Sequence, residues 1–160
     1  MVYVAIVGMG DHAHGLAHLF SMNNIDNDTT LVVTKPNLQM PPCESTNPFQ
    51  YFHNTLAHIV SWSQAVAMAD VMILAIPAAA LGSFVVHHEA QLRQGMILVD
   101  PTNSAARGED LQSLVSPNAT PWVKALNDVG ATNALLARPT SSKASVTLVC
   151  SPFPKAREVS

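Results

Sequence analysis

A glycine-rich turn between an apolar run and a helical pattern is the feature that most constrains how this chain can fold. Residues 4–7 are Val-Ala-Ile-Val, and the next six follow the pattern G-x-G-x-x-A. In such a turn the first glycine permits a sharp reversal, the second lets a ligand approach the backbone, and the small third residue lets the helix pack against the strand. The pattern predicts a strand, a phosphate-binding turn and a helix N-terminus, although a glycine turn without a ligand has the same letters.

Further apolar runs follow along the chain, with helical patterns between most of them. Most runs are apolar without alternation, as expected for strands that are covered on both faces. Strands are predicted at residues 3–7, 30–33, 56–60, 71–76, 96–99, 122–126 and 146–150. Helices are predicted at residues 13–21, 61–69, 78–92, 104–115 and 128–137. The alternation predicts an α/β fold with a single doubly wound, mostly parallel sheet of the Rossmann type.

Two proline-containing segments interrupt this alternation. Residues 35–54 hold four prolines, which disfavour a regular crossover helix, so we expect a long loop with one helical turn near residues 49–52. The last ten residues hold two prolines and are expected to be irregular. We therefore expect one dinucleotide-binding domain over residues 1–150 and a tail over residues 151–160.

Composition limits the classes of partner and compartment. Hydrophobic residues make up 48% of the chain and charged residues 12%, which predicts a folded domain. The net charge of -3 gives no basic field for nucleic acid, and no apolar run reaches the ~20 residues of a membrane span. Cys43 and Cys150 are too few for a disulfide framework or a zinc site. The N-terminus has no signal-peptide pattern, so a cytoplasmic protein is expected.

The end of the second predicted strand bears on which dinucleotide binds. NAD-binding domains usually place an acid there, where it bonds the ribose 2′-hydroxyl. This chain has Thr34, Lys35 and Pro36 instead. Thr34 can donate a hydrogen bond and Lys35 can supply a charge to a 2′-phosphate. A solvated surface lysine is the alternative, but together with the glycine turn the segment favours NADP(H).

Three histidines fall in the helix that follows the turn, namely His12, His14 and His18. The last two are four residues apart and share a helix face, a spacing that can hold a metal ion. No carboxylate or cysteine lies nearby to complete a ligand set. We therefore predict no metal site, and interpret both side chains as polar groups near bound phosphate.

Four segments, taken together and in order, resemble one family. They are "GDHAHGLA" from residue 10, "VVTKPN" from residue 32, "GMILVDPTN" from residue 95 and "WVKALNDVGA" from residue 122. They are similar to segments of the NADP-dependent oxidoreductases that reduce a deazaflavin coenzyme, and of the related cytoplasmic domain of the STEAP metalloreductases. The resemblance extends from residue 2 to about residue 150.

This resemblance implies an NADPH-binding domain that passes hydride to a flavin, a deazaflavin or a metal. It implies no catalytic acid or base, because the cofactors carry the chemistry. By position, it assigns the pyrophosphate turn to Gly8, Met9, Gly10, Asp11, His12, Ala13 and His14, and the 2′-phosphate to Thr34, Lys35 and Pro36. It further assigns to the cofactor Ala75, Ile76 and Pro77, and to the nicotinamide or acceptor end Pro101, Thr102, Asn103, Lys124 and Asn127.

Departures from the family pattern leave several points open. His14 replaces a basic residue, which weakens phosphate binding or makes it pH-dependent, and Lys35 replaces an arginine and loses its bidentate fork. Lys124 is interpreted either as a cofactor contact or as a lysine with a buried stem and a solvated end. Asn127 either bonds the cofactor or satisfies backbone groups at the strand end.

The function also has two open interpretations. The chain ends soon after the seventh predicted strand, whereas relatives continue, so a homodimer or a partner subunit is expected to complete the acceptor site. The first interpretation is an NADPH-dependent reductase. The second is a non-catalytic NADP(H)-binding module that senses redox state or serves a partner.

Overall fold

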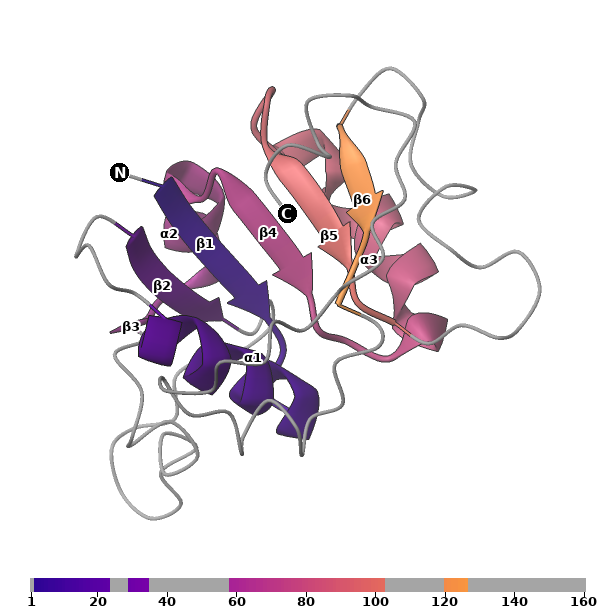
Figure 1. Ribbon diagram of the computed structural model, residues 1–160. Coiled ribbons are helices and arrows are strands. Elements are labelled where there is room, and N and C mark those ends of the chain that lie inside the picture. The colour runs from indigo at the N-terminus through magenta and orange to yellow at the C-terminus, as the bar shows by residue number, and fades with distance from the viewer. Residues whose placement is uncertain (1, 24–28, 35–57, 103–119, 127–160) are drawn as a thin grey trace, which may run out of the picture.

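The computed structural model describes residues 2–23, 29–34, 58–102 and 120–126, which form a sheet with helices on both faces (Figure 1). The strands are β1 (Val2–Val7), β2 (Thr29–Thr34), β3 (His58–Ile59), β4 (Val71–Leu74), β5 (Ile97–Asp100) and β6 (Trp122–Lys124). The α-helices are α1 (Asp11–Asn23), α2 (Trp62–Met68) and α3 (Leu81–His88), and two 3₁₀ helices are η2 (Ala78–Ala80) and η3 (Glu89–Gln91). The strand predicted at 146–150, the helices predicted at 104–115 and 128–137, and the loop predicted at 35–54 lie outside these residues.

The sheet order is β3-β2-β1-β4-β5-β6, and each described strand pair is parallel. The chain therefore builds outward from β1 to β3, returns to β4 on the other side of β1, and continues outward to β6. This reversal confirms the predicted doubly wound α/β sheet of the Rossmann type. It also creates a topological switch point between β1 and β4.

Burial on both faces explains why the strand sequences are apolar without alternation. In β1, Val4 and Ile6 belong to a core cluster on the α1 side, whereas Ala5 and Val7 belong to one that includes residues of α2 and α3. β4 divides in the same way, as expected because neighbouring strand residues point to opposite faces. Successive positions of β1 and β4 thus need apolar side chains.

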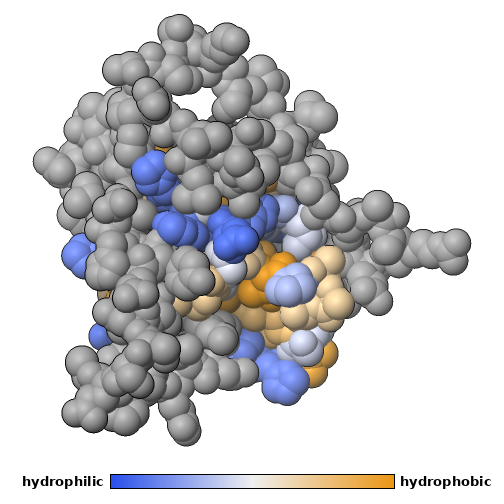
Figure 2. Space-filling view, turned by 90° about the horizontal axis from the view of Figure 1, so that it is seen from below, coloured by the Kyte–Doolittle hydropathy of each residue, from blue (hydrophilic) through white to orange (hydrophobic). Residues whose placement is uncertain are grey.

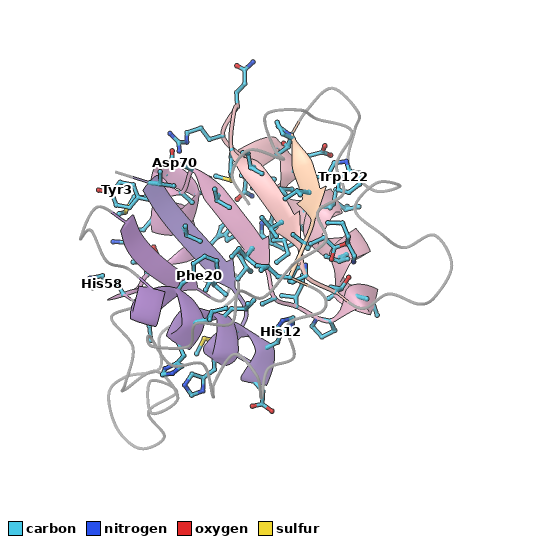
Figure 3. The ribbon with its side chains drawn as sticks, in the orientation of Figure 1. Tyr3, His12, Phe20, His58, Asp70 and Trp122 are labelled. Carbon is cyan, nitrogen blue, oxygen red and sulfur yellow. The ribbon has the colours of Figure 1, made fainter. Side chains whose placement is uncertain are left out.

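Local sequence signals position two of the helices. In α1, Ala13, Leu16 and Ala17 are buried, and Phe20 packs against the same cluster from the last part of the helix (Figure 3). A capping box begins α2, as the segment Ser61-Trp62-Ser63-Gln64 indicates: the Ser61 side chain accepts from the Gln64 amide (3.3 Å) and the Gln64 side chain accepts from the Ser61 amide (3.0 Å).

The prediction of one continuous helix over residues 78–92 is wrong. The segment divides into η2, α3 and η3, so only eight residues are α-helical. At its end the Gln91 side chain accepts from the Trp62 indole (2.7 Å) and donates to the His87 carbonyl (3.3 Å). These bonds, one of them to a distant helix, stabilise a tighter last turn that local helical propensity does not predict.

Asp70 joins three strands at the amino edge of the sheet, opposite the end where His12 lies (Figure 3). Its carboxylate accepts hydrogen bonds from the Tyr3 amide (3.0 Å) and from Arg93 (2.7 Å). Its backbone amide donates to the Tyr3 carbonyl (2.8 Å), and its carbonyl accepts from the Ile97 amide (2.9 Å). One residue therefore connects the starts of β1, β4 and β5.

The Tyr3 hydrogen bond lowers the pKa of Asp70 below its usual value, and Arg93 adds to this against partial burial. A carboxyl group with a lowered folded-state pKa adds stability above its unfolded pKa, and this is lost as the pH falls through the folded value. We expect Asp70→Asn to lower the free energy of unfolding by no more than about 1 kcal/mol at pH 7, because the ion pair is half-exposed.

Urea denaturation at two pH values tests this expectation. The difference between the native protein and the variant should shrink below about pH 4, where the native carboxyl group becomes protonated. An equal difference at both pH values would contradict the assigned role of the carboxylate.

Candidate functional site

The segments predicted to bind a cofactor meet at the carboxyl edge of the sheet. Residues 8–12 follow β1, residues 75–77 follow β4, residues 101–102 follow β5, and residues 125–126 follow β6. Because all these strands are parallel, their ends lie along one edge, which Figure 2 shows face on. Ligands of open α/β sheets bind outside this edge, at the switch point.

Gly8 is required by the contact between the ends of β1 and β4. Its φ is +141°, a conformation that residues with a side chain rarely adopt. A Cβ on Gly8 would lie 2.2 Å from the carbonyl oxygen of Ala75. The first glycine therefore allows two backbones to touch, which is a structural role distinct from binding.

The same contact explains where β4 ends. The strand was predicted to reach residue 76, but it stops at Leu74. The next two amides bond to carbonyls two residues earlier in the chain instead of to a neighbouring strand. Ala75 donates to the Ile73 carbonyl (3.1 Å) and Ile76 donates to the Leu74 carbonyl (2.8 Å). β4 thus leaves the sheet at the point where its backbone meets Gly8.

Gly10 has different surroundings from Gly8. It is exposed, and among the described residues no heavy atom beyond its two chain neighbours lies within 4 Å of the position that a Cβ would occupy. The first turn of α1 begins beside it, with the His14 amide donating to the Gly10 carbonyl (3.0 Å). The first amides of a helix have no acceptor within the helix, and they carry the positive end of its dipole. Open space thus adjoins the free amides at the N-terminus of α1, which are suited to an anion.

Ala13 has the packing role predicted for the third small residue. It is fully buried in the cluster on the α1 side of the sheet. Its Cβ lies 3.4 Å from the position of a Cβ on Gly8. A larger side chain would push α1 away from β1, so the small residue keeps the helix N-terminus near the switch point.

The histidines of α1 lie close to this turn. Burial, and then the nearby His18, lower the pKa of His14, whereas Asp11 opposes the shift. His14 is therefore neutral at pH 7. Within the described residues, no group of three or more His, Cys, Asp or Glu side chains is placed to hold a metal ion.

The segment after β4 gives the carboxyl edge an apolar surface. Residues 75–80 are Ala-Ile-Pro-Ala-Ala-Ala, and each of them is half-buried or exposed. Figure 2 shows apolar surface near the middle of this face, with hydrophilic residues beside it. Such a surface suits a flat ring that must be kept from water.

An ion pair with a fully buried carboxylate lies at the other end of the site, where β5 and β6 end. Asp100 and Lys124 are register partners, and the Lys124 Nζ donates to the Asp100 carboxylate (3.0 Å). Thr102 donates to the same carboxylate from its amide (2.9 Å) and its hydroxyl (2.6 Å). The Lys124 Nζ also donates to the Thr102 hydroxyl (3.1 Å) and to its carbonyl. We call these three residues the Asp100 clamp.

The clamp answers one question that the sequence left open. Lys124 was interpreted either as a cofactor contact or as a lysine whose end is solvated. Its Nζ is bonded within the protein and 24% of its side chain is exposed, so the interpretation with a solvated end is wrong, whereas the cofactor contact stays a prediction. Asp100 was not among the predicted site residues, although a charged residue ending an apolar strand needs a buried partner and so gives a signal in the sequence.

Some predicted site residues lie outside the described part of the chain. These are Lys35, Pro36, Asn103 and Asn127. Thr34 is the last residue of β2 and pairs in register with Val7 at the end of β1. The backbone therefore brings Thr34, the glycine turn, residues 75–77, residues 101–102 and Lys124 to one edge.

The helices of the described residues are short compared with a membrane span. None of those in residues 2–23, 29–34, 58–102 and 120–126 is long and apolar enough to cross a membrane.

The fold and this edge define a Rossmann-type NAD(P)-binding domain of the oxidoreductase class. The chain matches the family described as NADP oxidoreductase, coenzyme F420-dependent, over residues 3–104. It belongs to that family, which confirms the family predicted from the sequence. The narrower resemblance to the STEAP cytoplasmic domain stays a prediction.

Solved structures share the fold at low sequence identity. A candidate F420-dependent NADP reductase from Arthrobacter sp. FB24 has a TM-score of 0.70 and 17% identity, over 99% of this chain and 77% of that one. A pyrroline carboxylate reductase from Plasmodium falciparum with NADP bound has a TM-score of 0.60 and 16% identity, over 99% of this chain and 52% of that one.

A third structure shares the fold but belongs to an enzyme that prefers NADH. An NADH-preferring ketol-acid reductoisomerase from an uncultured archaeon has a TM-score of 0.72 and 15% identity, over 99% of this chain and 46% of that one. No protein with a curated description matches the sequence.

The contrast between the two glycines gives a test of the turn. We expect Gly8→Ala to lower the free energy of unfolding by about 3 kcal/mol, because the new Cβ meets a carbonyl and the φ angle is strained. The matched variant Gly10→Ala should change it by less than about 1 kcal/mol, because open space receives the methyl group. Thermal and urea denaturation measure both, and equal losses would contradict the geometry.

Proposed function

We propose that this chain binds NADP(H) along the carboxyl edge of its sheet and presents the nicotinamide for hydride transfer. The observation that carries the proposal is the turn at Gly10, where open space adjoins the N-terminus of α1. An anion there gains about 0.3–1 kcal/mol from the helix dipole at an exposed site, in addition to amide hydrogen bonds. We assign the pyrophosphate to this position. The other residues of the turn are Gly8, Met9, Asp11, His12 and Ala13.

The strand order supports a direction for the cofactor. β2 lies on one side of β1, and β4, β5 and β6 lie on the other. We therefore assign the adenosine to the β2 side and the nicotinamide to the side of β5 and β6. Thr34 and Lys35, which supply no carboxylate, favour a 2′-phosphate and hence NADP(H). The fold alone does not decide this, since similar structures include an NADH-preferring enzyme and an NADP-bound one.

NADPH, when bound, supplies a hydride, so the chain needs no acid or base of its own. Its residues have to hold the two rings together and exclude water. The apolar surface of residues 75–80 suits that task. The family description favours a deazaflavin acceptor, and a flavin is close to it in chemistry. The narrower STEAP resemblance favours a metal acceptor instead.

One observation favours a second candidate function. Lys124 and Thr102 bond with Asp100 instead of extending toward a ligand. The described residues therefore supply few polar groups that would orient an acceptor. This suits a non-catalytic NADP(H)-binding module that senses redox state or serves a partner. For the reductase, it suits an acceptor site completed by a second copy or by a partner subunit.

Titration with nucleotides tests the claim that both functions share. We expect NADPH to raise the melting temperature and to bind at least about tenfold more tightly than NADH, because of the charge near the 2′-phosphate. We expect Gly10→Ala to bind NADPH at least about tenfold more weakly at unchanged stability, because its methyl group occupies the pyrophosphate position. If neither nucleotide binds the native protein, both functions are wrong.

Oxidation of NADPH separates the two functions. FMN, FAD, a deazaflavin and ferric chelates are offered in turn, and absorbance at the NADPH band is followed. Turnover with one acceptor supports the reductase, and Gly10→Ala is then expected to raise KM for NADPH. Binding without turnover on any acceptor supports the module.

His14 gives a pH-dependent contribution that can be isolated. Burial lowers its pKa, so it is neutral at pH 7 and becomes positive only at a lower pH. We expect the affinity for NADP⁺ to rise between about pH 8 and about pH 5.5 more in the native protein than in His14→Gln, by about threefold. Titration of the nucleotide phosphate affects both proteins alike, so the difference between them isolates the contribution of His14. The same pH profile in both proteins would exclude a role for His14.

A further inference from the structure

The Asp100 clamp lies at the end of the site that the proposed function assigns to the nicotinamide. The Asp100 side chain is fully buried at the end of β5, and a buried carboxylate is costly unless it is paired and hydrogen-bonded. It accepts two bonds from Thr102 and one from Lys124. Both of its oxygens are thus used within the protein.

The donor groups of the clamp also have all their hydrogens in hydrogen bonds within the protein. A lysine ammonium has three hydrogens. The Lys124 Nζ has three acceptors, which are the Asp100 carboxylate, the Thr102 hydroxyl and the Thr102 carbonyl. The Thr102 hydroxyl donates its one hydrogen to Asp100. Lys124 and Thr102 therefore fix each other, and the loop after β5 is tied to the end of β6.

The backbone beyond β6 depends on the same residue. The Ala125 amide donates to the Asp100 carbonyl (3.3 Å). The next residue, Leu126, has a φ of 66°, and its side chain packs on the α1-side cluster. A non-glycine residue in this region costs about 1–3 kcal/mol and persists only where its surroundings hold it. Asp100 thus holds both chain segments that leave the sheet here.

We propose that Asp100 is a positioning residue for the nicotinamide end of the cofactor. This inference rests on the proposed function. The carboxylate contacts neither cofactor nor acceptor; it fixes Lys124 and Thr102, and through them the loops beside the nicotinamide. The proposed function assigns the adenosine to the β2 side and the pyrophosphate to the switch point, away from the clamp. Loss of the carboxylate should therefore weaken binding of the nicotinamide half of the cofactor more than binding of the adenosine half.

Two probes separate the halves of the cofactor. Adenosine 2′,5′-bisphosphate has the adenosine and the 2′-phosphate but no nicotinamide, whereas NADPH has both ends. The ratio of their dissociation constants measures what the nicotinamide, its ribose and the second phosphate together add to binding. Bound NADPH also fluoresces from its nicotinamide ring, so its emission maximum reports the surroundings of that ring.

The main variant is Asp100→Asn, which keeps the size of the side chain and removes its charge. We expect its affinity for adenosine 2′,5′-bisphosphate to stay within about twofold of native, and the advantage of NADPH to fall about fivefold or more, as for lost hydrogen bonds to charged groups. We expect the NADPH emission maximum to shift toward that of the free nucleotide. Asp70→Asn is the matched control, because it removes a carboxylate from the other edge of the sheet and should leave the ratio unchanged.

A second variant covers the case in which Asp100→Asn does not fold. Thr102→Val removes the hydroxyl at the centre of the clamp and leaves the Asp100–Lys124 pair intact. We expect a smaller fall in the same ratio, of about threefold. An unchanged ratio in whichever variants fold overturns the inference, as does an equal loss of affinity for both probes, which would mark Asp100 as structural only. A native protein that binds neither probe overturns the proposed function itself, and the inference with it.

Discussion

The close approach of Gly8 to the Ala75 carbonyl is the contact on which the rest of the site depends. It brings the turn after β1 against the end of β4, at the only place in the described sheet where the strand order reverses. Because Gly8 has no side chain, β4 can turn away there and α1 can begin close to the sheet. The small Ala13 then lets that helix stay close to β1. The helix N-terminus and the open space at Gly10 follow from these two small residues.

The two edges of the sheet carry different kinds of ion pair. At the amino edge, Asp70 and Arg93 are about half-exposed, and their bonds connect three strand starts. At the carboxyl edge, Asp100 is fully buried, and its bonds all lie near the proposed nicotinamide position. A half-exposed pair contributes little more than local stability. An ion pair with a buried carboxylate adds little net stability, but it fixes the geometry of the groups that it joins. That property suits an edge where loops must be placed accurately.

The sequence predicted the parts of the structure that local chemistry decides. The apolar strands, the glycine turn and the capping box at Ser61 all follow from short segments, and the structure has them. It did not predict the break in the helix over residues 78–92, because the bond from Trp62 to Gln91 joins distant segments. It did not predict the Asp100 clamp either, since that requires knowing that β5 and β6 are neighbours in register. The glycine turn could be predicted from the sequence, whereas the partners of Lys124 could not.

In the proposed complex, a dinucleotide lies across the carboxyl edge with its pyrophosphate at the N-terminus of α1. A crystal structure of the protein with NADP(H) bound tests this most directly. We expect pyrophosphate oxygens within hydrogen-bonding distance of the amides that follow Gly10, the adenosine toward β2, and the nicotinamide toward the ends of β5 and β6. A nucleotide bound elsewhere, or bound here in the reverse direction, would contradict it.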